Sequence, residues 1–121
     1  MAKKVLAVDD SKTMRDMVSF ALRSAGFDVI EAEDGRRAIE KLASTKVDLV
    51  ITDLNMPNMD GIALIKALRA DARCRSVPIL LLTTESDPGK KTEGRAAGAT
   101  GWLVKPFNPE KLVELVNRVC A

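Results

Sequence analysis

Apolar residues along this chain gather into short continuous runs separated by segments with helical spacing. The runs cover residues 5–8, 27–30, 47–51, 78–82 and 100–104. Short stretches of β-branched and aliphatic residues bounded by turn residues are typical of buried strands. After most of these runs, apolar residues recur every three or four positions, as in an amphipathic helix. The pattern predicts five strands that alternate with five helices.

Capping residues mark the ends of the predicted helices. Gly26 is expected to close the first helix, and Asp34, Asp60 and Asn108 to start the second, third and fifth, since glycine often follows helix ends and Asp or Asn often precede helix starts. The residues expected to face the core are Met14, Met17, Val18, Ala21, Leu22, Ala38, Ile39, Leu42, Ile62, Leu64, Ile65, Leu68, Leu112, Val113, Leu115, Val116 and Val119.

The fourth helix, over residues 89–97, is the weakest of these predictions. Asp87 followed by Pro88 is a typical helix start, but Gly94 interrupts the segment and few large apolar residues mark a buried face. We therefore expect this helix to be the one best suited to move.

The alternation of strands and helices through short connections predicts an α/β fold. Its centre is a five-stranded parallel sheet with helices on both faces and right-handed crossovers. The chain of 121 residues suits a single domain, residues 1–121, with no linker or internal repeat. No effector domain is expected, so any output would pass through a partner.

Composition excludes several classes of protein. The net charge of +2 and the lack of a long basic run argue against a dedicated nucleic-acid binder. No apolar stretch approaches the ~20 residues of a membrane span, and the short apolar stretch at the N-terminus, which turns acidic, is not expected to be a signal peptide. Cys74 and Cys120 show neither metal spacing nor a disulfide framework, which predicts a reduced, cytoplasmic protein. Histidine is absent, so no histidine can act here as nucleophile, base or metal ligand.

Polar residues follow four of the five predicted strands. Asp9 and Asp10 follow the first, Asp53 the third, Thr83 the fourth and Lys105 the fifth. The carboxyl ends of parallel strands share one edge of the sheet, where ligands of open α/β sheets bind. Each group also has a structural explanation: a turn or helix cap for the aspartates, a strand-end hydroxyl for Thr83, a solvated amine for Lys105. Their joint occurrence at one edge favours a site.

Three neighbouring carboxylates repel one another unless a cation lies between them. Mg²⁺ prefers oxygen ligands and is often bound through one or two carboxylates and a substrate phosphate. A lysine and a hydroxyl beside such a group describe a phosphoryl-transfer site. A carboxylate is then the obvious nucleophile, which would give an aspartyl phosphate.

The motifs at these strand ends resemble the receiver domain of two-component response regulators. They are VDDS at residues 8–11, TDLNMPNMDG at 52–61, LLTTES at 81–86 and GWLVKPF at 101–107. The resemblance covers essentially the whole chain, in the family's order, and is strongest to the single-domain chemotaxis regulators. It implies a flavodoxin-like (βα)5 fold with strand order 2-1-3-4-5.

The resemblance also implies roles for individual residues. Asp53 would be the phosphoacceptor. Asp9, Asp10, Asp53 and the backbone carbonyl of Asn55 would hold Mg²⁺, with Asp9 acting through water. Lys105 would contact the incoming phosphoryl group, and its bond to Pro106 would be a cis peptide, as is usual in this family.

Further implied roles concern signalling and its duration. Thr83 and Trp102 would act as the switch, with Trp102 at a position where many relatives carry Tyr or Phe; core packing is the alternative for this residue. Asn55 and Glu85 lie at positions that tune dephosphorylation in relatives, with ordinary turn residues as the alternative.

The resemblance therefore predicts a phosphorylation-activated regulator of a two-component, chemotaxis-type pathway. A partner histidine kinase would donate the phosphoryl group, and a flagellar motor switch protein would bind the phosphorylated form, with a phosphatase as a further possible partner. The protein would catalyse only its own phosphorylation and dephosphorylation. Binding of nucleic acid and insertion into membranes are not expected.

Two other functions stay open at this point. The first keeps the domain and changes the output, to a phosphorelay or cell-cycle receiver. The second is an aspartate-nucleophile phosphatase, which is disfavoured because Asp9 and Asp10 lack the Asp-x-Asp spacing usual in such enzymes and the chain has little room for a substrate cap. A nucleotide-binding protein is weaker still, since no GxGxxG or P-loop pattern follows the first strand.

Overall fold

The computed structural model describes residues 2–56, 58–84, 88–105 and 107–120. Five strands form one parallel sheet in the order β2-β1-β3-β4-β5, as the resemblance implied. The strands are β1 (Lys4–Val8), β2 (Asp28–Ala32), β3 (Leu49–Asp53), β4 (Ile79–Thr83) and β5 (Gly101–Val104). The helices are α1 (Lys12–Ser24), α2 (Gly35–Leu42), α3 (Gly61–Ala70), α4 (Pro88–Ala97) and α5 (Pro109–Val119).

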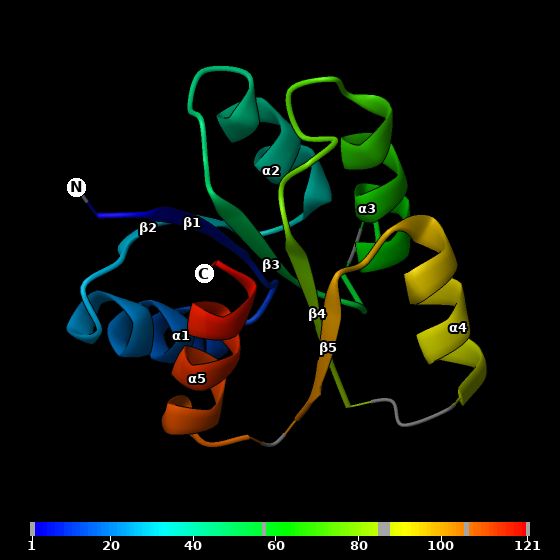
Figure 1. The fold of residues 1–121 in the computed structure, drawn as a ribbon. Helices are drawn as coiled ribbons and strands as arrows, with labels where there is room; N and C mark the ends of the chain where they lie inside the picture. Colours follow the sequence, from blue (N-terminus) through cyan, green and yellow to red (C-terminus); the bar gives the residue numbers. More distant parts are fainter. Residues whose placement is uncertain (1, 57, 85–87, 106, 121) are drawn as a thin grey trace.

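Two helical layers cover the sheet (Figure 1). Helices α1 and α5 lie on one face over Val5, Leu49 and Leu80, while α2, α3 and α4 lie on the other. Both faces of β3 and β4 are thus buried, and every residue of these two strands is inaccessible or nearly so. This burial explains the continuous apolar runs of their sequences, since a strand covered on both faces needs no polar side.

The helix ends follow the capping residues of the sequence. Ser11, Asp34, Asp60 and Asn108 each accept a hydrogen bond from the backbone three residues on, at the starts of α1, α2, α3 and α5. Gly26 follows α1 with φ of 96°, a conformation that glycine adopts without strain. Asp87, the expected cap of α4, lies outside the described residues.

Several details of the expected pattern are wrong. The third strand, expected over residues 47–51, is Leu49–Asp53, and the fourth, expected over 78–82, is Ile79–Thr83. Ile39 was placed in the core, but it is 38% exposed, because Ala38 and Leu42 form the buried stripe of α2. The second strand begins one residue later than expected and continues to Ala32, since Glu31 and Ala32 pair with β1. Gly94 does not interrupt α4, which is continuous from Pro88 to Ala97.

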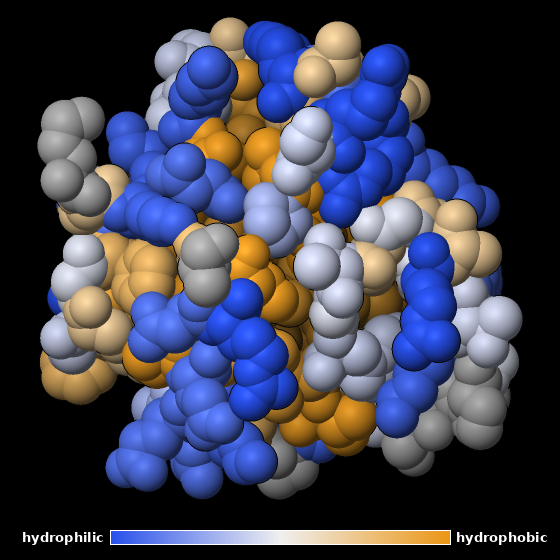
Figure 2. All heavy atoms as spheres, in the orientation of Figure 1, coloured by the Kyte–Doolittle hydropathy of each residue, from blue (hydrophilic) through white to orange (hydrophobic). Residues whose placement is uncertain are grey.

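Gly94 instead marks the point where α4 comes closest to the sheet. A Cβ atom at this position would lie 2.9 Å from Leu81 Cδ2 and 3.3 Å from the ring of Trp102. The helix lacks large apolar residues because it packs through its backbone at a glycine. Most of the other side chains of α4 are exposed. On the face of the molecule drawn in Figure 2, most residues are hydrophilic, and hydrophobic residues are visible between them.

Candidate functional site

Strand register brings the predicted site residues together at the carboxyl edge of the sheet. Val8 pairs with Thr52 and Asp53 with Leu82, so Asp9 and Asp53 emerge side by side. The backbone N–H of Lys105 donates to the carbonyl of Thr83 at 2.7 Å, which fixes the lysine at the same edge. The backbone pairing of the hydrophobic strands thus places Asp9, Asp53 and Lys105 close together at the carboxyl edge of the sheet.

The side chains of Asp9, Asp53 and Lys105 meet directly. Lys105 Nζ lies 3.0 Å from Asp53 Oδ1 and 3.2 Å from Asp9 Oδ2. The two carboxylates are almost fully buried, and the lysine side chain is 13% exposed. Short contacts between opposite charges in a poorly solvated place are stronger than the same contacts at the surface.

Asp9, Asp10 and Asp53 together can hold a cation. One carboxylate oxygen of each lies within 4.8 Å of the others. Asp10 is exposed, while the other two are buried, so the cluster opens to solvent on one side. Three hard oxygen donors with room for water suit Mg²⁺ and offer nothing to a metal that prefers sulfur or nitrogen. The residues present therefore fit the metal that the sequence predicted.

Burial and charge shift the pKa values of the central pair. Desolvation raises the pKa of Asp53, and Asp9 adds to this, while the hydrogen bond and charge of Lys105 oppose it. Burial alone would lower the pKa of Lys105, but its hydrogen bond to Asp53 and the charges of Asp53 and Asp9 outweigh this effect, so the pKa of the ammonium group is raised. Lys105 is therefore a permanent positive charge beside the phosphoacceptor candidate at neutral pH.

The other predicted residues take different positions. Thr83 is completely buried at the end of β4, and Asn55 is exposed, two residues past Asp53. Trp102 lies on β5, partly buried against the core on the α4 side. This packing agrees with the structural alternative for Trp102, and its switch role stays a prediction. Glu85 and the bond from Lys105 to Pro106 involve residues outside the described ones.

The helix-cap alternative for the first acidic motif is correct for Ser11. Its hydroxyl accepts from the N–H of Met14 at 3.2 Å, and its own N–H donates to Asp9 Oδ1 at 2.9 Å. Asp9 therefore orients the start of α1 and contacts Lys105 at the same time. The capping and functional explanations are not exclusive here.

Two residues that support the site were not found from the sequence. Arg15 Nη1 donates to the carbonyl of Asp9 at 2.6 Å, and no local pattern marks that contact. Gly61 was interpreted only as a helix start. A Cβ atom there would lie 2.4 Å from the carbonyl oxygen of Asp53, so α3 can begin against the phosphoacceptor candidate only with glycine at this position.

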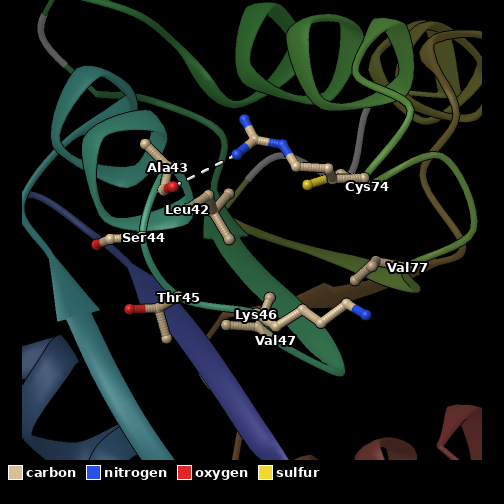
Figure 3. Close-up of a pocket in the computed structure, with 9 residues that line it drawn as sticks. Leu42, Ala43, Ser44, Thr45, Lys46, Val47, Cys74 and Val77 are labelled. Carbon is tan, nitrogen blue, oxygen red and sulfur yellow. Dashed lines mark hydrogen bonds between the residues drawn. The ribbon is translucent and has the colours of Figure 1, made fainter.

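A cavity of about 280 Å³ lies at the opposite, amino edge of the sheet (Figure 3). Its lining residues come from the end of α2, the loop into β3 and the loop into β4: Leu42, Ala43, Ser44, Thr45, Lys46, Val47, Arg73, Cys74 and Val77. Arg73 Nη1 reaches across it to the carbonyl of Ala43 at 3.4 Å. None of the predicted site residues lines this cavity, and the carboxylate cluster lies elsewhere.

Comparison with known proteins agrees with this arrangement. The family model for the response regulator receiver domain matches residues 5–117. Chemotaxis protein CheY of Pseudomonas aeruginosa is 41% identical over 117 residues, which cover 96% of this chain and 94% of that protein.

Solved structures give the same result. The chemotaxis response regulator CheY4 of Vibrio cholerae superimposes with a TM-score of 0.94 at 52% identity, over 98% of this chain and 99% of that one. The receiver domain of a sensor histidine kinase from Pseudomonas aeruginosa, solved with a magnesium ion coordinated in its active site cleft, has a TM-score of 0.91 at 28% identity, over 99% of this chain and 98% of that one.

Proposed function

Because the chain belongs to the response regulator receiver domain family, we propose that it is a phosphorylation-activated, single-domain regulator that carries its phosphoryl group on Asp53. The observation that supports this most directly is the contact of one lysine with two buried carboxylates at the carboxyl edge of the sheet. Such a set combines a nucleophile with a fixed positive charge for the group it attacks.

Phosphoryl transfer would proceed as follows. A carboxylate oxygen of Asp53 attacks the phosphorus of a phosphohistidine on the kinase, and the P–N bond breaks as the imidazole nitrogen leaves with the electron pair. Lys105 Nζ, 3.0 Å from Asp53, neutralises the phosphoryl oxygens as charge develops. Mg²⁺, held by Asp9, Asp10, Asp53 and the carbonyl of Asn55, would supply further positive charge when bound. The absence of histidine from this chain fits a donor histidine on the partner.

The same groups would limit the protein to reactions on itself. Once Asp53 is phosphorylated, water would attack the phosphorus, the P–O bond to the carboxylate would break, and inorganic phosphate would leave, at a rate that Asn55 and Glu85 would tune. The resting state would return without turnover of a separate substrate, so we do not class the protein as an enzyme. Turnover of a generic phosphomonoester well above the rate of self-dephosphorylation would instead support the phosphatase alternative.

The output is proposed to pass through the face formed by α4, β5 and α5. Phosphorylation would draw Thr83 and Lys105 toward the phosphoryl oxygens, which gives Trp102 room to turn and shifts the population between two packings. A hollow of about 190 Å³ beside Trp102 is lined by the basic side chains Lys91 and Arg95. These charges suit an acidic segment of a partner.

The named relatives favour chemotaxis over a general phosphorelay, since CheY and CheY4 are both chemotaxis regulators. We therefore propose a CheA-like histidine kinase as donor, a flagellar motor switch protein as target, a phosphatase as a possible further partner, and action in the cytoplasm. Within the described residues no helix is long and apolar enough to cross a membrane.

Phosphotransfer to Asp53→Asn tests the central assignment. The variant should accept no phosphoryl group from a kinase or a small phosphodonor, because the amide is not a nucleophile. Asp60→Asn is the matched control, since Asp60 belongs to the loop that follows and asparagine also caps a helix. Stoichiometric aspartyl phosphate on Asp53→Asn would contradict the assignment.

The output is tested separately by capture experiments with and without a beryllofluoride phosphate mimic. A peptide of the flagellar switch should bind only in the presence of the mimic. A histidine phosphotransfer domain that bound equally well in both states, with no binding of the switch peptide, would favour the relay function.

A further inference from the structure

The loop between β3 and α3 carries Asn55 and is tied to the start of α2. Asn58 Nδ2 donates to Asp34 Oδ2 at 3.1 Å, while Asp34 Oδ1 accepts from the N–H of Arg37 at 2.9 Å as the N-cap of α2. The two oxygens of one carboxylate thus hold two segments of the carboxyl edge together. We call the contact of Asp34 with Asn58 the loop clamp.

The backbone conformation of Asn58 favours asparagine at this position of the clamp. Among the described residues, Asn58 is the one non-glycine with positive φ, at 69°. Asparagine tolerates this conformation better than most residues, and it supplies the amide donor as well. The hydrogen bond from the backbone N–H of Arg37 and, less strongly, the one from the amide of Asn58 lower the pKa of Asp34, so the acceptor is a carboxylate at neutral pH.

Packing supports the same connection. A Cβ atom on Gly35 would lie 2.9 Å from both Cγ and Sδ of Met59, so the first turn of α2 rests directly on the residue after Asn58. The loop is also fixed at its ends, where Leu54 N–H donates to Leu82 O and Gly61 N–H donates to Leu54 O at 2.8 Å. The clamp adds a side-chain hydrogen bond between these two ends.

We propose that Asp34 and Asn58 are positioning residues for the cation site, because they fix the loop that presents the carbonyl of Asn55. This inference rests on the proposed function, in which that carbonyl is a metal ligand. Residues that orient metal ligands without touching the metal can change affinity considerably. Loss of one hydrogen bond on a partly exposed loop corresponds to an effect of about threefold to tenfold.

The two clamp residues allow a reciprocal exchange as the test. Asp34→Asn keeps a capping oxygen on α2 but turns an amide toward the amide of Asn58. Asn58→Asp tolerates the positive φ but faces the carboxylate of Asp34. The double variant Asp34→Asn/Asn58→Asp restores one donor and one acceptor with the polarity reversed, and it has the net charge of the wild type.

The measurement is the rise in melting temperature with Mg²⁺ concentration, each variant being compared with its own metal-free value. This removes any change in basal stability, because a ligand of the folded state adds stability according to its affinity. We expect each single variant to require about threefold to tenfold more Mg²⁺ for the same rise, and the double variant to lie within about twofold of the wild type. Asn108→Ala, which removes the cap of α5, should lower the metal-free melting temperature without changing the Mg²⁺ requirement.

Charge alone would give a different result. Asp34→Asn removes a negative charge and Asn58→Asp adds one, so a purely electrostatic effect would move the Mg²⁺ requirement in opposite directions. Opposite shifts, or a double variant no better than the single ones, would overturn the clamp. If the wild type itself showed no response to Mg²⁺ and no phosphorylation, the proposed function would be the part that failed.

Discussion

Lys105 and Arg69 are partly buried cations at opposite edges of the sheet, and the structure holds them in different ways. Lys105 contacts the carboxylates of Asp9 and Asp53. Arg69, near the end of α3, donates to backbone carbonyls of Cys74, Val77 and Gly98 at 2.7 to 3.0 Å. No carboxylate of the described residues forms an ion pair with it.

The pKa values of the two groups shift in opposite directions, because both are partly buried but only Lys105 has carboxylate partners. Burial lowers the pKa of Arg69 because no carboxylate compensates it. Two carboxylates outweigh burial at Lys105, whose pKa is raised. The hydrogen-bond donors of Arg69 are used by backbone carbonyls, so this residue joins loops and has no donor left for a ligand. The carboxylates beside Lys105 can bind another cation, and the ammonium group of Lys105 can contact an anion.

The comparison predicts the largest loss of stability at Arg69. Arg69→Met removes hydrogen bonds that join the loop before β4 to the turn before β5, and it leaves several carbonyls short of a donor. We expect a loss of about 3 kcal/mol in the free energy of unfolding, measured by urea denaturation. Arg118→Met is the control, because Arg118 forms an exposed ion pair with Glu114, and its loss should cost about 0.5 kcal/mol or less. Equal losses would contradict a structural role for Arg69.

Lys105→Met should have the reverse profile. Phosphorylation should slow about 100-fold, since a donor aimed at developing charge is worth about 3 kcal/mol. The free energy of unfolding should fall by only about 1 kcal/mol, because burial already disfavours the charged form of Asp53 in the wild type. The measurements are the rate with a small phosphodonor and a urea titration. A wild-type rate together with a larger stability loss than Arg69→Met would end the distinction between the two cations.

The two edges also differ in how far the sequence predicts them. Asp9, Asp53 and Lys105 were predicted together because each comes within two residues after the end of an apolar run, and parallel strands share one edge. Arg69 gave no signal, since its partners are carbonyls of any residue type, and chain folding alone decides which ones it reaches. Arg15 escaped prediction for the same reason, since it donates to the carbonyl of Asp9. Asn58 escaped because its partner, the carboxylate of Asp34, lies on another segment that only the folded chain brings close.

Glycine shows a similar limit. Gly26 follows a helix, and its local role was predicted correctly. Gly94 and Gly61 owe their identity to atoms outside their own helices, Leu81 and Trp102 in one case and the carbonyl of Asp53 in the other. The sequence indicated a break in α4 where the structure has close packing, because a single sequence does not distinguish a helix breaker from a point of close approach.

Asp53 should show the stability cost of a functional carboxylate. Its pKa is raised in the folded protein, first by burial, so ionisation favours the unfolded state. Without divalent ions at pH 7, Asp53→Asn should be more stable than the wild type by about 1 kcal/mol, as is common when a functional group is removed. This gain should shrink as pH falls through the pKa of folded Asp53 and disappear below the ordinary value near 3.8.

Melting curves of the two proteins at several pH values would measure this gain. Asp28→Asn, an exposed change on β2, serves as the control and should show no comparable gain. A loss of stability in Asp53→Asn at neutral pH would mean that the pair with Lys105 outweighs burial.

The smallest effect is expected at the exposed pair of Asp71 and Arg73, close in sequence to Arg69. The side-chain hydrogen bond from Arg73, at 2.8 Å, and its backbone N–H lower the pKa of Asp71 to about 2. A lowered pKa stabilises the folded state at pH values above the ordinary pKa of 3.8, and this contribution is lost as pH falls through about 2.

Asp71→Asn should therefore lower the melting temperature slightly at pH 6 and leave it unchanged below pH 2. Because water screens the pair, this shift should stay well below that of Arg69→Met, even though the pKa of Asp71 is strongly lowered. If Asp71→Asn destabilised the protein as much as Arg69→Met, surface charge and not carbonyl saturation would hold the amino edge together.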